Sequence, residues 1–261
     1  MSTKVYFLDG GTFAQDQSIV TFAIGIGKPF TSQVSSVFID SPEAKIIVET
    51  GMDPTIWPDF VKQILVPHQT EEQRLDRALG RIGVKPEDVD IVINTHLHAD
   101  HCSFNRIFKN ATWIIQRKEL MEALVPEVHE ITYVKSCFDV GLPQKLIDGD
   151  YEVARGVSIL STQGHTAGHQ SVAIETENSG VFLVTGDASM SKENFPGESS
   201  ISPQGWPCSP VLDAKAHMRS LERLGDFVKS TKARTHRTCT VLYGHDESEF
   251  KKLKSAPAYY E

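Results

Sequence analysis

The stretch Asp90-Ile-Val-Ile-Asn-Thr-His-Leu-His-Ala-Asp-His101 has four side chains that can bind metal in its last six positions. Its apolar first part, ending in polar residues, is typical of a buried strand. Alternate residues of an extended or tightly turning segment point the same way, so His96 and His98 can meet one ion. Asp100 and His101 lie past the bend and can face a second ion. Imidazole and carboxylate groups suit Zn²⁺ and similar divalent ions, so the sequence predicts a metal site here.

Three further polar clusters come after apolar runs: Gly164-His165-Thr166-Ala167-Gly168-His169, Thr185-Gly186-Asp187-Ala188 and Gly244-His245-Asp246. The flanking glycines of the first cluster let the backbone turn sharply, and one of its two histidines is the candidate ligand. A carboxylate at a strand end, such as Asp187, can bridge two ions. Taken alone, each cluster is explained as well by a turn or a helix cap. Beside the first motif, they indicate a site with two ions.

The apolar pattern along the chain predicts an α/β protein. Strands are expected at residues 4–8, 35–39, 45–48, 90–94, 112–115, 157–160, 171–174, 181–184 and 240–243. Helices are expected at 71–82 and 117–124, and a third should start at Ser209-Pro210 and bury Met218, Leu221 and Leu224. Residues 55–70 and 126–150 have no clear pattern. Four of the strands precede the His and Asp clusters, and strand ends can hold ligands to tight tolerance.

Length and charge restrict the class of protein. The 261 residues contain no internal repeat and no linker, so we expect one domain over residues 1–261. The formal net charge of −8 argues against nucleic acid as a partner, because proteins that bind a phosphate backbone usually have a basic face. No run approaches the roughly 20 apolar residues that span a bilayer. We therefore expect a small-molecule substrate, with no nucleic acid and no membrane as partner.

The four cysteines, Cys102, Cys137, Cys208 and Cys239, are widely separated and form no CxxC pair. A disulfide framework would be unusual in a chain of this size. We therefore predict a reduced, cytoplasmic protein in which the cysteines are small buried residues. A homodimer is compatible with the sequence.

Together the four clusters resemble the ligand motif of the metallo-β-lactamase superfamily, and the resemblance covers nearly the whole chain. It implies an αββα sandwich with the site at one edge of the two sheets. It also implies that His96, His98 and His165 hold one ion, that Asp100, His101 and His245 hold the other, and that Asp187 bridges them. In this family the first histidine of the Gly-His-x-x-Gly-His pair is the ligand, which leaves His169 a supporting role.

Shorter segments are similar to the N-acyl homoserine lactonases and the related pyridoxolactonases, among them 148–153, 168–171, 191–195 and 243–246. Those lactonases usually have a tyrosine three residues after the bridging Asp, where it can hydrogen-bond the lactone carbonyl. This chain has Met190 there, which cannot donate a hydrogen bond. It also has Ala99 where they often have a larger residue. A replacement phenol would have to come from another tyrosine, and the candidates are Tyr6, Tyr133 and Tyr151.

The resemblance implies a hydrolase that opens a lactone ring with two divalent ions, most simply Zn²⁺, with Fe or Mn as alternatives. As a hypothesis, a hydroxide between the ions attacks the carbonyl, and one ion stabilises the oxyanion. Asp100 would relay a proton or only bind metal.

Two other functions fit the same motifs. Thioester hydrolases of the glyoxalase II type share both histidine motifs, and Met190 favours them. A non-catalytic metal-binding sensor is the other alternative, although a complete set of ligands argues against it.

Overall fold

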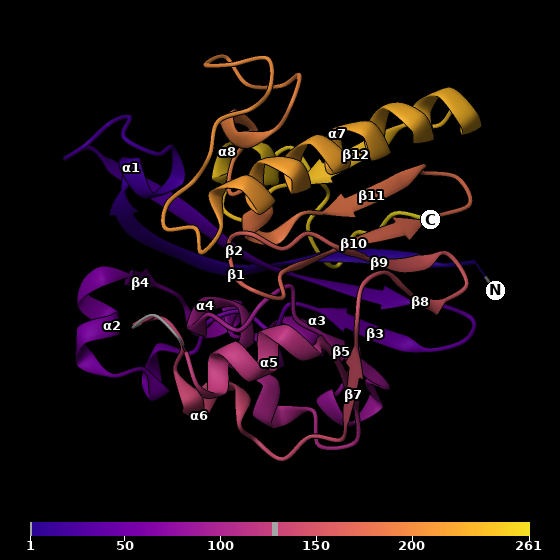
Figure 1. Cartoon of the computed structure of the whole chain (residues 1–261). Coiled ribbons are helices and arrows are strands. Elements are labelled where there is room, and N and C mark those ends of the chain that lie inside the picture. Colours follow the sequence, from indigo (N-terminus) through magenta and orange to yellow (C-terminus); the bar gives the residue numbers. More distant parts are fainter. Residues whose placement is uncertain (1, 127–129) are drawn as a thin grey trace.

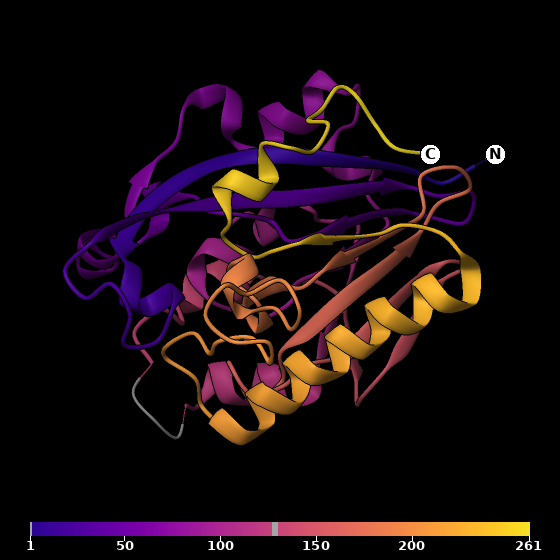
Figure 2. The same ribbon diagram turned by 90° about the horizontal axis from the view of Figure 1, so that it is seen from above.

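Two β-sheets form the centre of the molecule, and helices cover their outer faces (Figure 1). The structure is a computed structural model that describes residues 2–126 and 130–261. Helix α7 (Ala214–Thr235) lies along the outer face of one sheet, and helices α2 to α6 lie beyond the other (Figures 1 and 2). The αββα sandwich that the sequence predicts is confirmed.

The larger sheet has seven strands in the order β4-β1-β2-β3-β5-β6-β7. Their bounds are β1 Lys4–Asp16, β2 Pro29–Asp40, β3 Lys45–Val48, β4 Val66–His68, β5 Ile91–Ile93, β6 Thr112–Gln116 and β7 Gln144–Ile147. Strands β1 to β4 pair antiparallel, whereas β3, β5, β6 and β7 run parallel. The carboxyl ends of the parallel strands therefore meet at one edge of the sheet.

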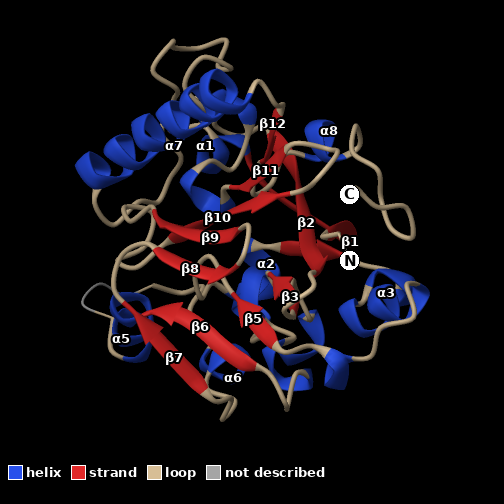
Figure 3. Cartoon of the chain, turned by 90° about the vertical axis from the view of Figure 1, so that its right-hand side faces the viewer, coloured by secondary structure: helices blue, strands red, loops and turns tan. Residues whose placement is uncertain are grey.

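The second sheet has five strands in the order β12-β11-β10-β9-β8. They are β8 Tyr151–Ala154, β9 Val157–Ser161, β10 Gln170–Glu175, β11 Val181–Val184 and β12 Cys239–Leu242. The pair β11 and β12 is parallel and the other pairs are antiparallel. Figure 3 shows the two layers of strands between the helices.

Alternation along the strands explains why the two sheets stack. In β3, Ile46 and Val48 join a core between the sheets that also contains Ile174 and Val184 of the second sheet. Ile47, between them in sequence, faces the opposite way and packs with residues of the helices. Successive side chains of a strand point to opposite faces, so one apolar run supplies both the central and the outer core.

The helices are short apart from α7. They are α1 Gln17–Val20, α2 Asp59–Ile64, α3 Leu75–Arg81, α4 Ala99–Cys102, α5 Arg117–Leu124, α6 Lys135–Phe138 and α8 Glu247–Phe250. Helix α7 buries Leu221, Leu224 and Val228, and the last two pack with Leu183 of the second sheet. Met218, which the sequence predicts to be buried, is half-buried. No helix in the described part of the chain is both long and apolar enough to cross a membrane.

The predicted helix start at Ser209-Pro210 is wrong. Helix α7 begins at Ala214, and the Asp213 side chain caps it by accepting a hydrogen bond from the Ala216 N–H at 2.9 Å. Ser209 instead donates its N–H to the Ile19 carbonyl at 2.8 Å. Ser209 and Asp213 are both typical capping residues, and Asp213 is the one that caps α7.

The helix predicted at 71–82 is divided into a 3₁₀ turn, Glu71–Gln73, and α3. In the unclear segment 126–150, residues 127–129 lie outside the described part, and the remainder contains α6 and β7.

Candidate metal centre

The seven predicted ligands converge at the ends of strands from both sheets. Strand β5 leads into the loop and helix α4 that contain His96, His98, Asp100 and His101, and the other three follow β9, β11 and β12. Their ligand atoms form two buried groups, each with its atoms within 4.8 Å of one another: His96, His98, His165 and Asp187 in the first, and Asp100, His101 and His245 in the second.

The Asp187 carboxylate lies between the two groups. Its Oδ2 is 3.5 Å from His165 Nε2 and 3.9 Å from His96 Nε2, in the first group. Its Oδ1 is 3.2 Å from His245 Nε2 and 3.4 Å from His101 Nε2, in the second. One oxygen thus faces each group, which is the arrangement that a bridging carboxylate needs.

Several buried atoms of the two groups have no hydrogen-bond partner within residues 2–126 and 130–261. They include Nε2 of His96, Nε2 of His101 and Oδ1 of Asp187. In addition, Nδ1 of His98 and Nε2 of His165 face each other at 3.3 Å. Buried polar atoms without partners are costly, and ring nitrogens and carboxylate oxygens are ligands for divalent ions. The residues present therefore fit one divalent ion in each group.

The electrostatics of the two groups differ. Burial, reinforced by the neighbouring histidines, lowers the pKa of His96 well below its usual value. Burial also lowers the pKa of His165, to about 4. In the second group, burial is outweighed by Asp100 and Asp187, which raise the pKa of His101. The pKa of Asp187 is well below its usual value because His245 and His101 outweigh the effect of burial. The histidines of the first group therefore favour the neutral imidazole, whereas Asp100 and Asp187 raise the pKa of His101 in the second group.

In four of the five histidines, His98 being the exception, the ring nitrogen that points away from the group is fixed by a hydrogen bond. Such bonds set the orientation and tautomer of a metal-binding histidine. The pairs are His96 Nδ1 with Thr95 Oγ1 at 3.1 Å, His101 Nδ1 with Glu49 Oε2 at 2.5 Å, His165 Nδ1 with the Pro210 carbonyl at 3.0 Å, and His245 Nδ1 with the Gln33 carbonyl at 2.9 Å.

His169 lies behind Asp187 and belongs to neither group. Its Nε2 accepts hydrogen bonds from the N–H groups of Asp187 at 3.0 Å and Ala188 at 3.2 Å. Its Nδ1 is 2.9 Å from Thr162 Oγ1. Since Nε2 is the acceptor, the ring proton lies on Nδ1 and the ring holds the backbone of the Asp187 turn.

Comparison with known proteins agrees with this geometry. The sequence matches the metallo-beta-lactamase superfamily over residues 30–236. The chain belongs to the metallo-β-lactamase superfamily. It is 36% identical to an N-acyl homoserine lactonase of Bacillus thuringiensis, over 98% of each chain, and 28% identical to one of Rhizobium radiobacter, over 98% of each. The solved structure of an N-acyl homoserine lactone hydrolase, with the product N-hexanoyl-L-homoserine at its catalytic metal centre, matches with a TM-score of 0.84, 36% identity and 98% coverage of each chain.

Two buried glutamates support this superfamily site, and the sequence analysis missed both. Glu49 follows β3 in a left-handed conformation with φ of 63°. Such a conformation is unfavourable for a residue with a side chain, and it marks positions with a special role. Glu119 lies on α5 and is fully buried. The available signals were an acidic residue directly after an apolar strand and another within an amphipathic helix.

Met190 stands at the position where the N-acyl homoserine lactonases usually have a tyrosine. Met190 is buried and packs with Val20 and Cys208. Of the three candidate tyrosines, Tyr133 lies beside the site: its ring centroid is 5.0 Å from that of His98. Tyr6 packs against Tyr259, and Tyr151 contacts Lys145.

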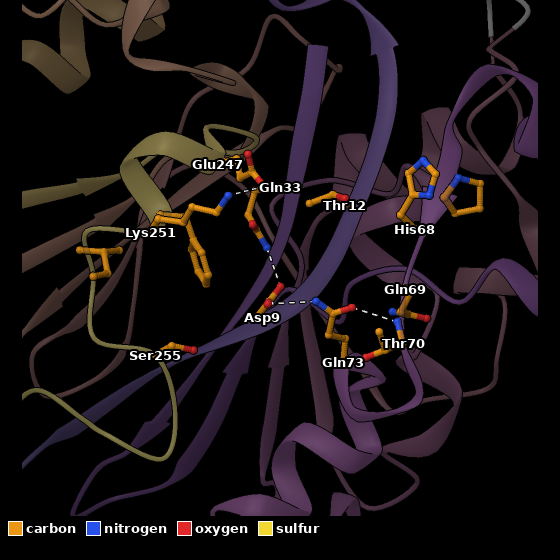
Figure 4. A pocket seen from close by; sticks show the side chains of 13 residues that line it. Asp9, Thr12, Gln33, His68, Gln69, Thr70, Gln73, Glu247, Lys251 and Ser255 are labelled. Atoms are coloured by element: carbon orange, nitrogen blue, oxygen red, sulfur yellow. Dashed lines mark hydrogen bonds and ion pairs between the residues drawn. The ribbon is translucent and has the colours of Figure 1, made fainter. Parts of the chain in front are cut away.

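A cleft of about 860 Å³, lined by both polar and apolar side chains, lies apart from the candidate ligands (Figure 4). Asp9 is at its centre and accepts hydrogen bonds from the side chains of Gln33 at 2.8 Å and Gln73 at 3.0 Å. None of the seven candidate ligands lines it. Gln33 connects the two regions, because its carbonyl is the partner of His245 Nδ1.

Proposed function

We propose that this protein is a two-metal hydrolase that opens the ring of an N-acyl homoserine lactone or a related small lactone. The observation that carries the proposal is the Asp187 carboxylate, with one oxygen toward each of two histidine-containing groups. The similarity to N-acyl homoserine lactonases over 98% of the chain supports the substrate class.

In this proposal His96, His98 and His165 would hold one ion, Asp100, His101 and His245 would hold the other, and Asp187 would be a ligand of both. When bound, such ions polarise a carbonyl and lower the pKa of bound water. Hydrogen bonds to their outer ring nitrogens orient four of the ligand histidines, His96, His101, His165 and His245. His101 and, to a smaller degree, His245 outweigh the effect of burial and lower the pKa of Asp100. Asp100 is therefore ionised at neutral pH and is our candidate for taking up a proton and passing it to the leaving alkoxide.

The test is proton release in weak buffer with protein loaded with Zn²⁺, Mn²⁺ or Fe²⁺. The panel contains short and long acyl homoserine lactones, pyridoxolactone, a simple γ-lactone and a glutathione thioester. We expect rapid acidification with a lactone and none with His96→Ala or Asp187→Asn. If only the thioester is hydrolysed, the metal-site assignment is retained, but the proposal that the substrate is a lactone is refuted.

Finer features belong to the same proposal. We propose zinc as the resident metal, since histidine-rich sites suit it, and elemental analysis of the purified protein tests this. Removal of acyl homoserine lactones would make the protein a quorum-quenching enzyme.

Four buried, unpaired cysteines support a reducing compartment such as the cytoplasm. A core shared by both sheets supports a single domain over residues 1–261. A homodimer stays a prediction, and sedimentation would test it.

A further inference from the structure

We propose that Glu119 is a positioning residue that holds the first ligand group, His96, His98 and His165, in the geometry that binds one ion. The inference rests on the ligand assignment proposed above. Glu119 lies on α5, outside every motif that contains a ligand, and its side chain is fully buried. A buried carboxylate must be matched by donors, and three of the four donors to Glu119 come from the ligand loops.

Four hydrogen bonds converge on this carboxylate. Oε1 accepts the Leu97 N–H at 3.0 Å and the Tyr133 hydroxyl at 3.1 Å. Oε2 accepts the Thr166 hydroxyl at 2.6 Å and the Gly168 N–H at 3.0 Å. Each oxygen is thus used twice, and no donor is a charged side chain.

The positions of these donors connect the carboxylate to the ligands. Leu97 lies between His96 and His98 in the chain, and Thr166 directly follows His165. A single side chain therefore joins two ligand loops whose histidines, His98 and His165, are 67 residues apart in sequence. The distance between these loops decides whether the three imidazoles can reach one ion.

Gly168 shows how closely the second loop approaches α5. A Cβ atom at this position would lie 2.2 Å from the Glu119 backbone nitrogen. Only glycine therefore allows the Gly168 N–H to reach the carboxylate.

Tyr133 adds a contact between Glu119 and the ligand His98. Its hydroxyl is bound by Glu119, and its ring lies against the His98 ring with centroids 5.0 Å apart. Glu119 thus restrains His98 both through the backbone of Leu97 and through the Tyr133 ring.

The second ligand group has different supports. His101 Nδ1 is bonded to Glu49, and His245 Nδ1 donates to the Gln33 carbonyl. The His101 carbonyl accepts the Asn94 side-chain amide at 2.8 Å. Loss of the Glu119 carboxylate should therefore weaken one ion far more than the other. A general structural role would instead weaken both ions alike.

The test compares Glu119→Gln with Glu72→Gln, a matched change at an exposed glutamate. Co²⁺ is titrated into metal-free protein, and visible absorption and chelator competition give the affinity of each step. His98→Ala and His245→Ala identify the step that belongs to each group. Glutamine keeps the size of Glu119 but turns one acceptor into a donor that faces two donors.

We expect Glu119→Gln to weaken the step that His98→Ala abolishes by about 10-fold or more, the usual cost of losing a residue that orients a ligand. The step that His245→Ala abolishes should change little, and Glu72→Gln should change neither. Thr166→Val removes a single donor with little change in shape, so it should weaken the same step less. If Glu119→Gln does not fold, Thr166→Val still allows the positioning role to be tested.

Equal weakening of both steps, or no weakening, by Glu119→Gln and Thr166→Val would overturn the positioning role. Binding of fewer than two ions by the unaltered chain would overturn the ligand assignment itself, and with it this inference.

Discussion

Replacement of Glu49 by glutamine tests whether the second ligand group depends on the proton position of one imidazole. Glu49 is 4% exposed, and its Oε2 lies 2.5 Å from His101 Nδ1. Its Oε1 accepts the Thr95 N–H, also at 2.5 Å. A carboxylate at this position requires that His101 carry a proton on Nδ1. In the neutral ring that binds an ion, the lone pair is then on Nε2, which faces Asp100 and Asp187 at 3.3 Å and 3.4 Å.

Glutamine has nearly the same size but cannot serve both neighbours in the same way. If its oxygen keeps the Thr95 N–H, its NH₂ group meets the Nδ1–H of His101. The imidazole must then move its proton to Nε2, where an ion should bind. A hydrogen bond to a charged group is worth about 1.5–3 kcal/mol. That corresponds to about 10- to 100-fold in metal affinity, the range found for partners of metal-binding histidines.

The assay is competition for the metal between the protein and a chromophoric chelator at fixed pH. Glu49→Gln should weaken the ion of the second group by about 10- to 100-fold and lower kcat/KM for the lactone. Glu49→Asp keeps the charge on a shorter side chain, so its metal affinity should lie between those of the unaltered chain and Glu49→Gln. An affinity within twofold of the unaltered chain would refute the argument from the tautomer.

Three further predictions concern the surroundings of the site. Burial lowers the pKa of His217 to about 4, so the unfolded chain binds a proton that the folded chain excludes as pH falls below about 6.5. Between pH 7.5 and 5.0 the unaltered chain should thus lose about 2 kcal/mol more unfolding free energy than His217→Asn in urea titrations. A Cβ on Gly186 would lie 2.5 Å from Thr95 Oγ1 and 2.8 Å from His169 Nε2. Gly186→Ala should therefore lower kcat/KM at least about 10-fold. Gly80→Ala is the control and should not lower kcat/KM, because a Cβ there would meet nothing within 4 Å. Chelation should lower Tm, because an ion at 100 times its Kd adds about 2.7 kcal/mol, and calorimetry with and without chelator would show no change if no ion binds.

The strands that sequence analysis missed share a position in the fold. Strands β4 and β7 are the two edges of the larger sheet, and β8 is an edge of the smaller one. Their residues are largely exposed or half-buried, so no apolar alternation marks them. The predicted strands β3, β5 and β11 lie inside the sheets and are almost continuously apolar. A hydrophobic pattern reports burial, and edge strands have less of it.

The ligands could be predicted because each lies next to a strong local signal, whereas their supports could not. Glu119 is on a helix whose bounds, Arg117–Leu124, were predicted correctly. Its four donors, however, come from three segments that are distant in sequence. Nothing local distinguishes such a residue from a solvated glutamate on a helix. The wrong helix start at Ser209 has a similar origin, because the Ser209 N–H bonds to the Ile19 carbonyl of α1, which is distant in sequence.

Glu49 and Glu119 act on the same short loop from opposite ends. Glu49 accepts the Thr95 N–H and Glu119 accepts the Leu97 N–H, so the backbone on each side of His96 is bound by a buried carboxylate. The Thr95 carbonyl is also used, by the Gln170 N–H at 2.9 Å. The His96 ring has only the Thr95 hydroxyl as a side-chain hydrogen-bond partner within the described residues. The ring also packs against the His101 ring, with centroids 4.1 Å apart. The two glutamates, which lie outside the ligand motif, thus bind the backbone that carries the His96 ring.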